Sequence, residues 1–97
     1  MTSVCTGSFL LHAAGIARGR RLTTHWSCID ELRNRGDGDV REHVRFVVDG
    51  NVVTAAGVSA GIDMSLWVLG QLHDPAFARE VQHYIEYAPA PPYAFEA

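Results

Sequence analysis

Patterns typical of strands and helices alternate along this chain, and this alternation constrains its fold more than any other feature. The patterns predict strands at residues 2–4, 22–24, 44–48 and 52–55, and helices at residues 8–17, 27–35, 60–72 and 75–87. Such alternation is typical of a three-layer α/β arrangement, with helices on both faces of a mostly parallel sheet. So few short strands leave sheet edges uncovered. We therefore expect residues 1–97 to form one partial α/β domain with an incomplete sheet and an irregular tail at 88–97.

Turn and capping residues set the boundaries of the later elements. The turn at residues 49–51 lies between two β-branched segments and favours an antiparallel hairpin. Ser59 is expected to cap the helix at 60–72, whose apolar residues cover most of its circumference, so this helix should be largely buried. Asp74 followed by Pro75 predicts the start of the last helix.

Weaker signals mark the boundaries in the first half of the chain. Gly15 and Gly19 lie where the first helix is expected to stop. Ser27 and Asp30 have the spacing of a capping box for the second helix. Residues 36–39, which read GDGD, are expected to form a loop.

Length and charge restrict the class of protein. A chain of 97 residues is enough for one domain, which buries roughly two-thirds of the surface of its unfolded chain. Eight basic residues against eleven acidic ones give a net charge of −3 without a basic stripe, so we expect no nucleic-acid partner. The apolar run at 9–17 lacks the preceding positive charges of a signal peptide. No segment approaches the roughly 20 apolar residues of a membrane span, so we expect no membrane partner.

The two cysteines, Cys5 and Cys28, lie far apart in the sequence. This spacing fits a reducing compartment better than a disulfide scaffold, and we expect a cytoplasmic protein. Cys28 is expected to lie in the core. His25 and Cys28 are spaced like half of a metal site, but the sequence holds no matching second pair, so we expect neither a metal nor a cofactor.

Cys5 lies between the end of a short apolar strand and the start of a helix, which is the position of a nucleophile. Backbone donors and the dipole at a helix N-terminus stabilise a thiolate. Gly7 allows the backbone to approach closely. The alternative is that Cys5 is a small buried apolar residue, which is common for free cysteines.

Three segments carry a resemblance to a known family: SVCTGSFLLHAAGIARGRRLTTHW, VVTAAGVSAGIDMSLWV and IEYAPAPPY. They resemble the C-terminal half of the ThiJ/PfpI superfamily, which is glutamine amidotransferase-like, and its isonitrile hydratase-like branch in particular. The resemblance implies a flavodoxin-like domain, usually dimeric, with the cysteine in a strained elbow between strand and helix. Family members include hydratases, deglycase or chaperone-like proteins, reported proteases and sensor domains of AraC-type regulators. The resemblance thus determines the fold of the chain more closely than any reaction that it catalyses.

The resemblance also implies roles for residues beside Cys5. Thr6 resembles a catalytic residue of the hydratase branch; its amide is a candidate oxyanion donor, and its hydroxyl a candidate contact for substrate or water. His25, in the segment TTHW, matches the position at which other members place a histidine that orients or activates the thiolate. On sequence alone, Thr6 is equally a residue of the first helical turn, and His25 a partly buried, hydrogen-bonded histidine.

The segment GVSAGID resembles one that packs a helix N-terminus close to the nucleophile pocket. Its glycines, Gly57 and Gly61, allow close approach. Ser59 is first a helix cap and only second a contact for a ligand. Together with Gly7, these residues are the expected lining of a small-molecule pocket.

The family's acidic residue comes from the N-terminal half, which these residues do not contain. We therefore expect a fragment or half-domain, inactive alone, that forms a homodimer or is completed by an N-terminal half. Three hypotheses follow: an isonitrile hydratase-like enzyme, a small-molecule sensor domain of an AraC-type regulator, and a non-catalytic remnant that binds a relative through its sheet edge. The ending IEYAPAPPY resembles that of the stand-alone enzymes, which favours the first.

Overall fold

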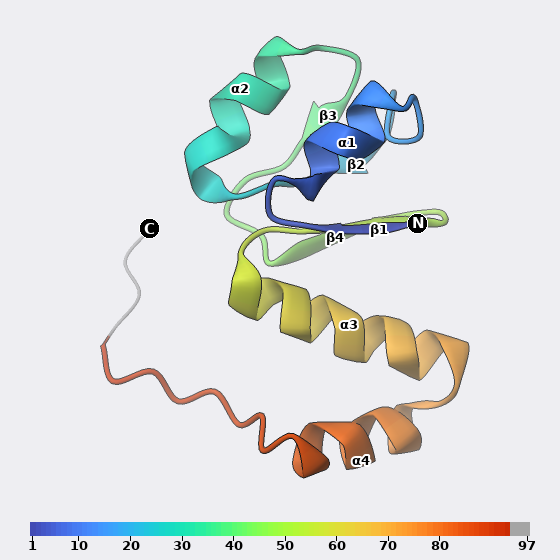
Figure 1. Cartoon of the computed structure of the whole chain (residues 1–97), viewed down its shortest axis with the longest axis vertical. Helices are drawn as coiled ribbons and strands as arrows, with labels where there is room; N and C mark the ends of the chain where they lie inside the picture. The colour runs from blue at the N-terminus through green and yellow to red at the C-terminus, as the bar shows by residue number, and fades with distance from the viewer. Residues whose placement is uncertain (94–97) are drawn as a thin grey trace. The chain divides into compact units, whose positions relative to one another are not determined.

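The computed structural model describes residues 1–93 (Figure 1). Its elements in chain order are β1 (Thr2–Val4), α1 (Gly7–Ala13), β2 (Arg21–Leu22), the 3₁₀ turn η1 (Trp26–Cys28), α2 (Ile29–Asn34), β3 (Asp39–Val40), β4 (Phe46–Asp49), β5 (Val52–Ala55), α3 (Val58–Leu72) and α4 (Pro75–Tyr84). The chain divides into two compact units, Met1–Met64 and Ser65–Ala97, which are described separately.

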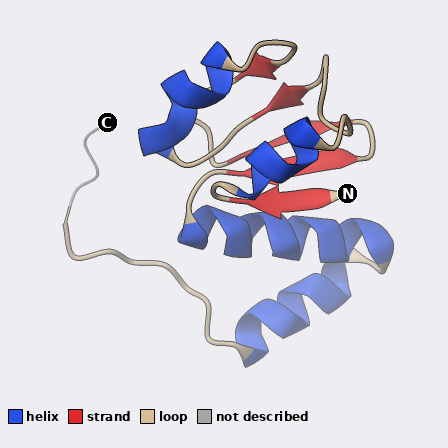
Figure 2. Cartoon of the chain, turned by 45° about the horizontal axis from the view of Figure 1, so that its top comes forward, coloured by secondary structure: helices blue, strands red, loops and turns tan. Residues whose placement is uncertain are grey.

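The main sheet of the first unit has the strand order β1-β5-β4, and Figure 2 shows these strands side by side. β1 runs parallel to β5, with Ser3 opposite Thr54. β4 and β5 pair antiparallel, with Asp49 opposite Val52, which confirms the predicted hairpin. Every residue of β5 is buried, as expected for a central strand.

Helices cover both faces of β1. Ser3 and Val4 are neighbours in the strand, so their side chains point to opposite faces. A Cβ atom placed on Gly7 of α1 would lie 3.4 Å from the Ser3 Cβ, whereas one on Gly61 of α3 would lie 2.7 Å from the Val4 Cγ1. α1 therefore packs on the Ser3 face and the first turns of α3 pack on the Val4 face.

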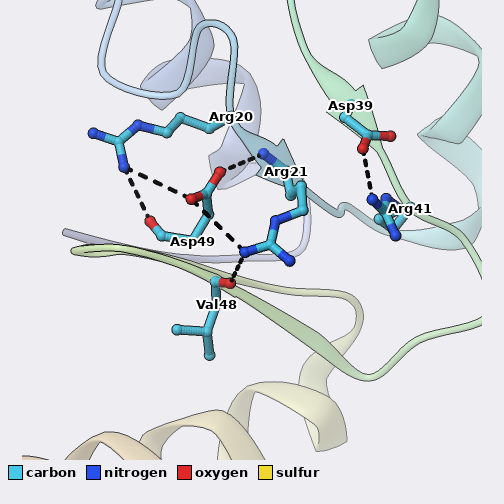
Figure 3. Close-up of polar contacts among 6 residues, drawn as sticks. All are labelled: Arg20, Arg21, Asp39, Arg41, Val48 and Asp49. Carbon is cyan, nitrogen blue, oxygen red and sulfur yellow. Dashed lines mark hydrogen bonds and ion pairs between the residues drawn. The ribbon is translucent and has the colours of Figure 1, made fainter.

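A second sheet consists of β2 and β3, which pair in parallel. Asp49 at the end of β4 links it to the main sheet, because its Oδ2 accepts a 2.8 Å hydrogen bond from the Arg21 backbone N–H (Figure 3). The Arg20 Nη1 donates to the Asp49 carbonyl at 3.2 Å, and the Arg21 Nη2 donates to the Val48 carbonyl at 3.2 Å. The main apolar cluster of this unit comprises Leu11, Ala17, Leu22, Ile29, Leu32, Val40 and Val52.

The first helix is shorter than the sequence predicts. It ends at Ala13 and not at residue 17, because Gly15 takes a left-handed conformation with a φ of 84°. The N–H groups of Ile16 and Ala17 then turn back to the Leu11 carbonyl. Ala17 is nevertheless fully buried, so its apolar character reflects the core and not the helix.

The segments around the second helix also differ from expectation. Ser27 does not cap an α-helix; it lies within η1, and α2 begins only at Ile29. The expected loop at 36–39 contains the start of β3, and the expected strand at 22–24 is β2, which ends at Leu22. The strand predicted from residue 44 begins at Phe46.

Two predictions for α3 were wrong. The helix begins at Val58, so Ser59 lies inside its first turn and is not its cap. Burial within the helix is confined to Ala60, Gly61 and Met64, and Leu72 is 82% exposed, so the helix is not largely buried.

The second unit contains the rest of α3 together with α4. The Asp74 carboxylate accepts a 2.7 Å hydrogen bond from the Phe77 N–H, which confirms the predicted cap. α4 ends at Tyr84 rather than residue 87, and Glu86 has a φ of 55°. Residues 88–93 form no helix or strand, as predicted for the tail, and its last part, 94–97, lies outside the described residues. Within residues 1–93, no helix has the length and apolar character needed to cross a membrane.

The contact between α3 and β1 is testable at Gly61. We expect Gly61→Ala to destabilise the protein by about 1–3 kcal/mol, because the new methyl group would overlap the short, stiff Val4 side chain. Gly70→Ala in the same helix is the matched control: its methyl group would meet only ordinary contacts of 3.7 Å or more, so it should stabilise by about 0.5–1 kcal/mol. Urea unfolding measures both changes, and equal effects would contradict this packing.

The cap of α4 gives a dependence on pH. The Phe77 N–H, followed by His73, lowers the pKa of Asp74 from 3.8, so the charged cap stabilises the folded state above that value and loses this contribution as the pH falls through the lower, folded-state pKa. The difference in unfolding free energy between wild type and Asp74→Ala should therefore be constant at neutral pH and shrink below pH 3.8. Urea titrations over a pH series measure it; a difference that grows in acid would contradict this.

Candidate functional site

Cys5 forms a sharp turn between β1 and α1. Its φ is 56°, in the left-handed region, which costs a residue with a Cβ atom roughly 1–2 kcal/mol. The Cys5 N–H donates to the Ala55 carbonyl at 3.1 Å, so the turn is attached to the end of β5. Cys5 is partly buried and is a free thiol. This geometry is the elbow that the sequence predicts.

Two buried hydroxyl groups hold the carbonyl oxygen of Cys5. The Thr24 Oγ1 donates to it at 2.9 Å and the Ser8 Oγ donates at 3.4 Å. The Phe9 N–H, which would bond the Cys5 carbonyl in a continuous helix, donates instead to Thr6. The hydroxyls therefore replace a helical hydrogen bond that the turn removes.

The neighbouring threonines extend this anchorage into the sheets. The Thr23 N–H donates to the Thr54 Oγ1 at 2.9 Å, and the Thr23 Oγ1 donates to the Arg41 carbonyl at 2.8 Å. Thr23, Thr24 and Thr54 are each at most 1% exposed. The sequence pattern predicted these threonines only as strand residues. Their signal was the presence of polar residues where a buried strand favours valine or isoleucine.

Thr6 and Gly7 lie directly after the elbow. Thr6 precedes α1, is exposed, and its side chain makes no capping hydrogen bond. Gly7 is the first residue of α1 and packs against Ser3. The backbone N–H groups of Thr6 and Gly7 therefore lie at the start of the helix that follows Cys5.

His25 lies next to Thr24, and thus beside the elbow. Its Nδ1 accepts a 3.2 Å hydrogen bond from the Ser27 N–H and lies 2.7 Å from the Ser27 Oγ. The ring Cδ2 would lie 3.9 Å from a Cβ atom on Gly57, so the ring faces the segment after β5. The structure thus brings His25, Gly57 and the Cys5 turn to the same end of the parallel strands β1 and β5.

The other two residues expected to line a pocket, Ser59 and Gly61, lie in the first turns of α3. Gly61 contacts Val4, as described above. Ser59 is exposed and its Oγ accepts a 3.2 Å hydrogen bond from the Arg45 Nη2, while the Arg45 Nε donates to Asp63. Sequence reasoning did not single out Arg45, whose position before β4 carried no motif.

Cys28 is partly buried and is also a free thiol. Its Sγ lies 3.7 Å from the Ser27 Oγ. Across residues 1–93, no group of three His, Cys, Asp or Glu side chains has the arrangement of a metal site.

The anchor of the elbow is testable at Thr24. We expect Thr24→Val to destabilise the protein by about 1–3 kcal/mol, because it removes the shorter of the two hydroxyl contacts to a buried carbonyl. Thr24→Ser keeps the hydroxyl and should lose much less. Denaturant unfolding of both variants measures the difference, and equal losses would mean that Thr24 acts through its methyl group alone.

Curated relatives match most of this chain. Isonitrile hydratase from Pseudomonas putida is 47% identical over 93 residues, which cover 96% of this chain and 40% of that protein. The HTH-type transcriptional regulator CdhR from Pseudomonas aeruginosa is 38% identical over 76 residues, which cover 78% of this chain and 23% of the regulator. The chain thus spans less than half the length of the curated relatives it matches.

A solved structure and a family model agree with these relatives. The crystal structure of a ThiJ/PfpI family protein from Pseudomonas syringae is 44% identical, with a TM-score of 0.85 over 95% of this chain and 37% of that one. This similarity confirms the predicted flavodoxin-like α/β fold. The model of the DJ-1/PfpI family matches residues 1–71. With nearly three-quarters of its length inside that model and the elbow at its start, this chain belongs to the DJ-1/PfpI family.

Proposed function

We propose that this chain provides the nucleophilic part of a cysteine-dependent, isonitrile hydratase-like domain. The observation that carries the proposal is the Cys5 turn, whose left-handed backbone is held by two buried hydroxyls and the end of β5. Such strain persists at functional sites where surrounding contacts determine it. The 47% identity with isonitrile hydratase over nearly the whole chain supports this choice of reaction.

The proposed reaction adds water to an isonitrile in two steps. The Cys5 thiolate attacks the terminal carbon, and that carbon takes a proton, giving a thioimidate in which Cys5 is joined to carbon. Water then adds to the same carbon, the carbon–sulfur bond breaks, and an N-substituted formamide leaves with the thiolate restored. The backbone N–H of Thr6 is the candidate donor to developing charge, its exposed hydroxyl is the candidate contact to water, and His25 orients the thiolate.

The proton in this scheme comes from an acidic residue outside these 97 residues. The chain covers 40% of isonitrile hydratase, so turnover requires an N-terminal half, either joined to this chain or supplied by another. β1 is an edge strand of the described sheet, where such a half can add a strand. We further propose a homodimer of completed domains in the cytoplasm, where the two free thiols of Cys5 and Cys28 stay reduced.

The second candidate function is a small-molecule sensor. The relationship to the regulator CdhR, at 38% identity, supports it, because that protein is named as an HTH-type transcriptional regulator. In this case the surface around the Cys5 turn, His25 and Gly57 binds a ligand without turnover. Gly57 and the exposed Ser59 then matter for the affinity of the ligand, and Cys5 is not consumed or modified.

The test uses a completed domain, formed by this chain and the N-terminal part of the Pseudomonas putida isonitrile hydratase. We expect Cys5→Ala to lower the rate of conversion of an alkyl isonitrile to the formamide by on the order of 10³-fold or more, because it removes the nucleophile. Cys28→Ala is the matched control and should retain turnover. Gas chromatography of the formamide measures both.

Each other result has a distinct meaning. Equal loss from the two cysteine variants would assign Cys5 a structural role. Saturable binding of the isonitrile by the completed domain, with no formamide formed by wild type, would support the sensor. Neither binding nor turnover in a folded, completed domain would leave the non-catalytic remnant as the function.

A further inference from the structure

The hydrogen bonds at His25 determine which of its ring nitrogens carries a proton. The backbone N–H of Ser27 can only donate, and it donates to the His25 Nδ1 at 3.2 Å. The Nδ1 must therefore present its lone pair. In a neutral imidazole one nitrogen is a donor and the other an acceptor, so the proton lies on Nε2.

The hydroxyl of Ser27 reinforces this arrangement. Its Oγ lies 2.7 Å from the same Nδ1 and, because that nitrogen is an acceptor, the hydroxyl donates to it. The Cys28 Sγ lies 3.7 Å from the Ser27 Oγ, where the thiol can donate in turn to the hydroxyl oxygen. The backbone N–H and the hydroxyl of Ser27 thus both direct their protons toward the Nδ1 of His25.

The opposite edge of the ring faces Gly57, in the segment after β5. The Cδ2 atom, which is bonded to Nε2, lies on the side of Gly57, 3.9 Å from where a Cβ atom of that residue would be. Gly57 follows β5, whose last residue, Ala55, accepts the hydrogen bond of the Cys5 N–H. The residue before His25, Thr24, donates to the Cys5 carbonyl.

We propose that Ser27 is a positioning residue, which holds His25 as the Nε2–H tautomer so that its ring offers a hydrogen-bond donor, and not a base, on the edge that faces Gly57, at the same end of β1 and β5 as the Cys5 turn. A donor there stabilises negative charge on the thiolate or on a bound intermediate, whereas an acceptor would repel it. The role of this donor in catalysis rests on the proposed function. The tautomer itself is a property of the chain alone.

The test is a two-bond ¹H–¹⁵N correlation spectrum of the full chain labelled with ¹⁵N-histidine, at about pH 8.5, where an ordinary histidine is neutral. The His25 signals are assigned by their loss in His25→Gln. We expect the Nε2–H pattern in wild type. Ser27→Ala should lower the ratio of Nε2–H to Nδ1–H forms by about fivefold, since one hydrogen bond is lost. Ser27→Thr keeps the hydroxyl and should keep the wild-type ratio, as should the control Ser65→Ala in the second unit.

Two results would overturn the proposal: a predominant Nδ1–H form in wild type, or an unchanged ratio in Ser27→Ala. The first needs no variant, so it does not depend on how well a variant folds. In the completed domain, Ser27→Ala should lower kcat while KM changes little, and Ser27→Thr should restore kcat. A confirmed tautomer in a domain that binds isonitrile without turnover would refute the proposed reaction and leave the positioning role intact.

Discussion

Cys5 is the residue at which three segments of the first unit meet. Thr24, which follows β2, and Ser8 of α1 donate to its carbonyl oxygen, while its N–H bonds the end of β5 at Ala55. A left-handed residue with a Cβ atom persists only where such contacts determine it. The conformation of the candidate nucleophile and the joining of the two sheets are thus maintained by the same hydrogen bonds.

The strength of these contacts depends on their burial. Asp49 also joins the two sheets, because its carboxylate accepts the Arg21 N–H at 2.8 Å and forms ion pairs with Arg20 and Arg21 at 3.9 Å. This hydrogen bond and both arginine side chains are exposed to solvent. Exposed ion pairs contribute about 0–1 kcal/mol, whereas an unsatisfied buried polar group costs about 1–3 kcal/mol. We therefore attribute the relative position of the sheets mainly to the buried hydroxyls of Thr24 and Thr54, and less to the charged groups in Figure 3.

The sequence predicted what depends on local pattern. The hairpin at residues 49–51, the cap at Asp74 and the turn at Cys5 each carry a local signal of turn, cap or strand end, and all three are present. It did not predict β3, because pairing with β2 gives two residues a strand conformation that only Val40 suggests. It also missed the hydrogen bonds of the buried threonines, since a polar residue in a buried strand shows that its hydroxyl needs a partner but not which partner it has.

The Cys5 turn and the proposed proton transfer depend on different parts of the completed domain. The contacts that shape the Cys5 turn all lie within Met1–Met64, so a neighbouring half-domain is not needed to form the elbow or to orient His25 beside Gly57. Proton transfer is different, because in the proposed reaction the acid comes from residues outside this chain. Under this proposal, the chain positions its thiol for attack before it has the means for turnover. Chemical reactivity of Cys5 and catalysis are accordingly two distinct properties, and only the second depends on what completes the sheet.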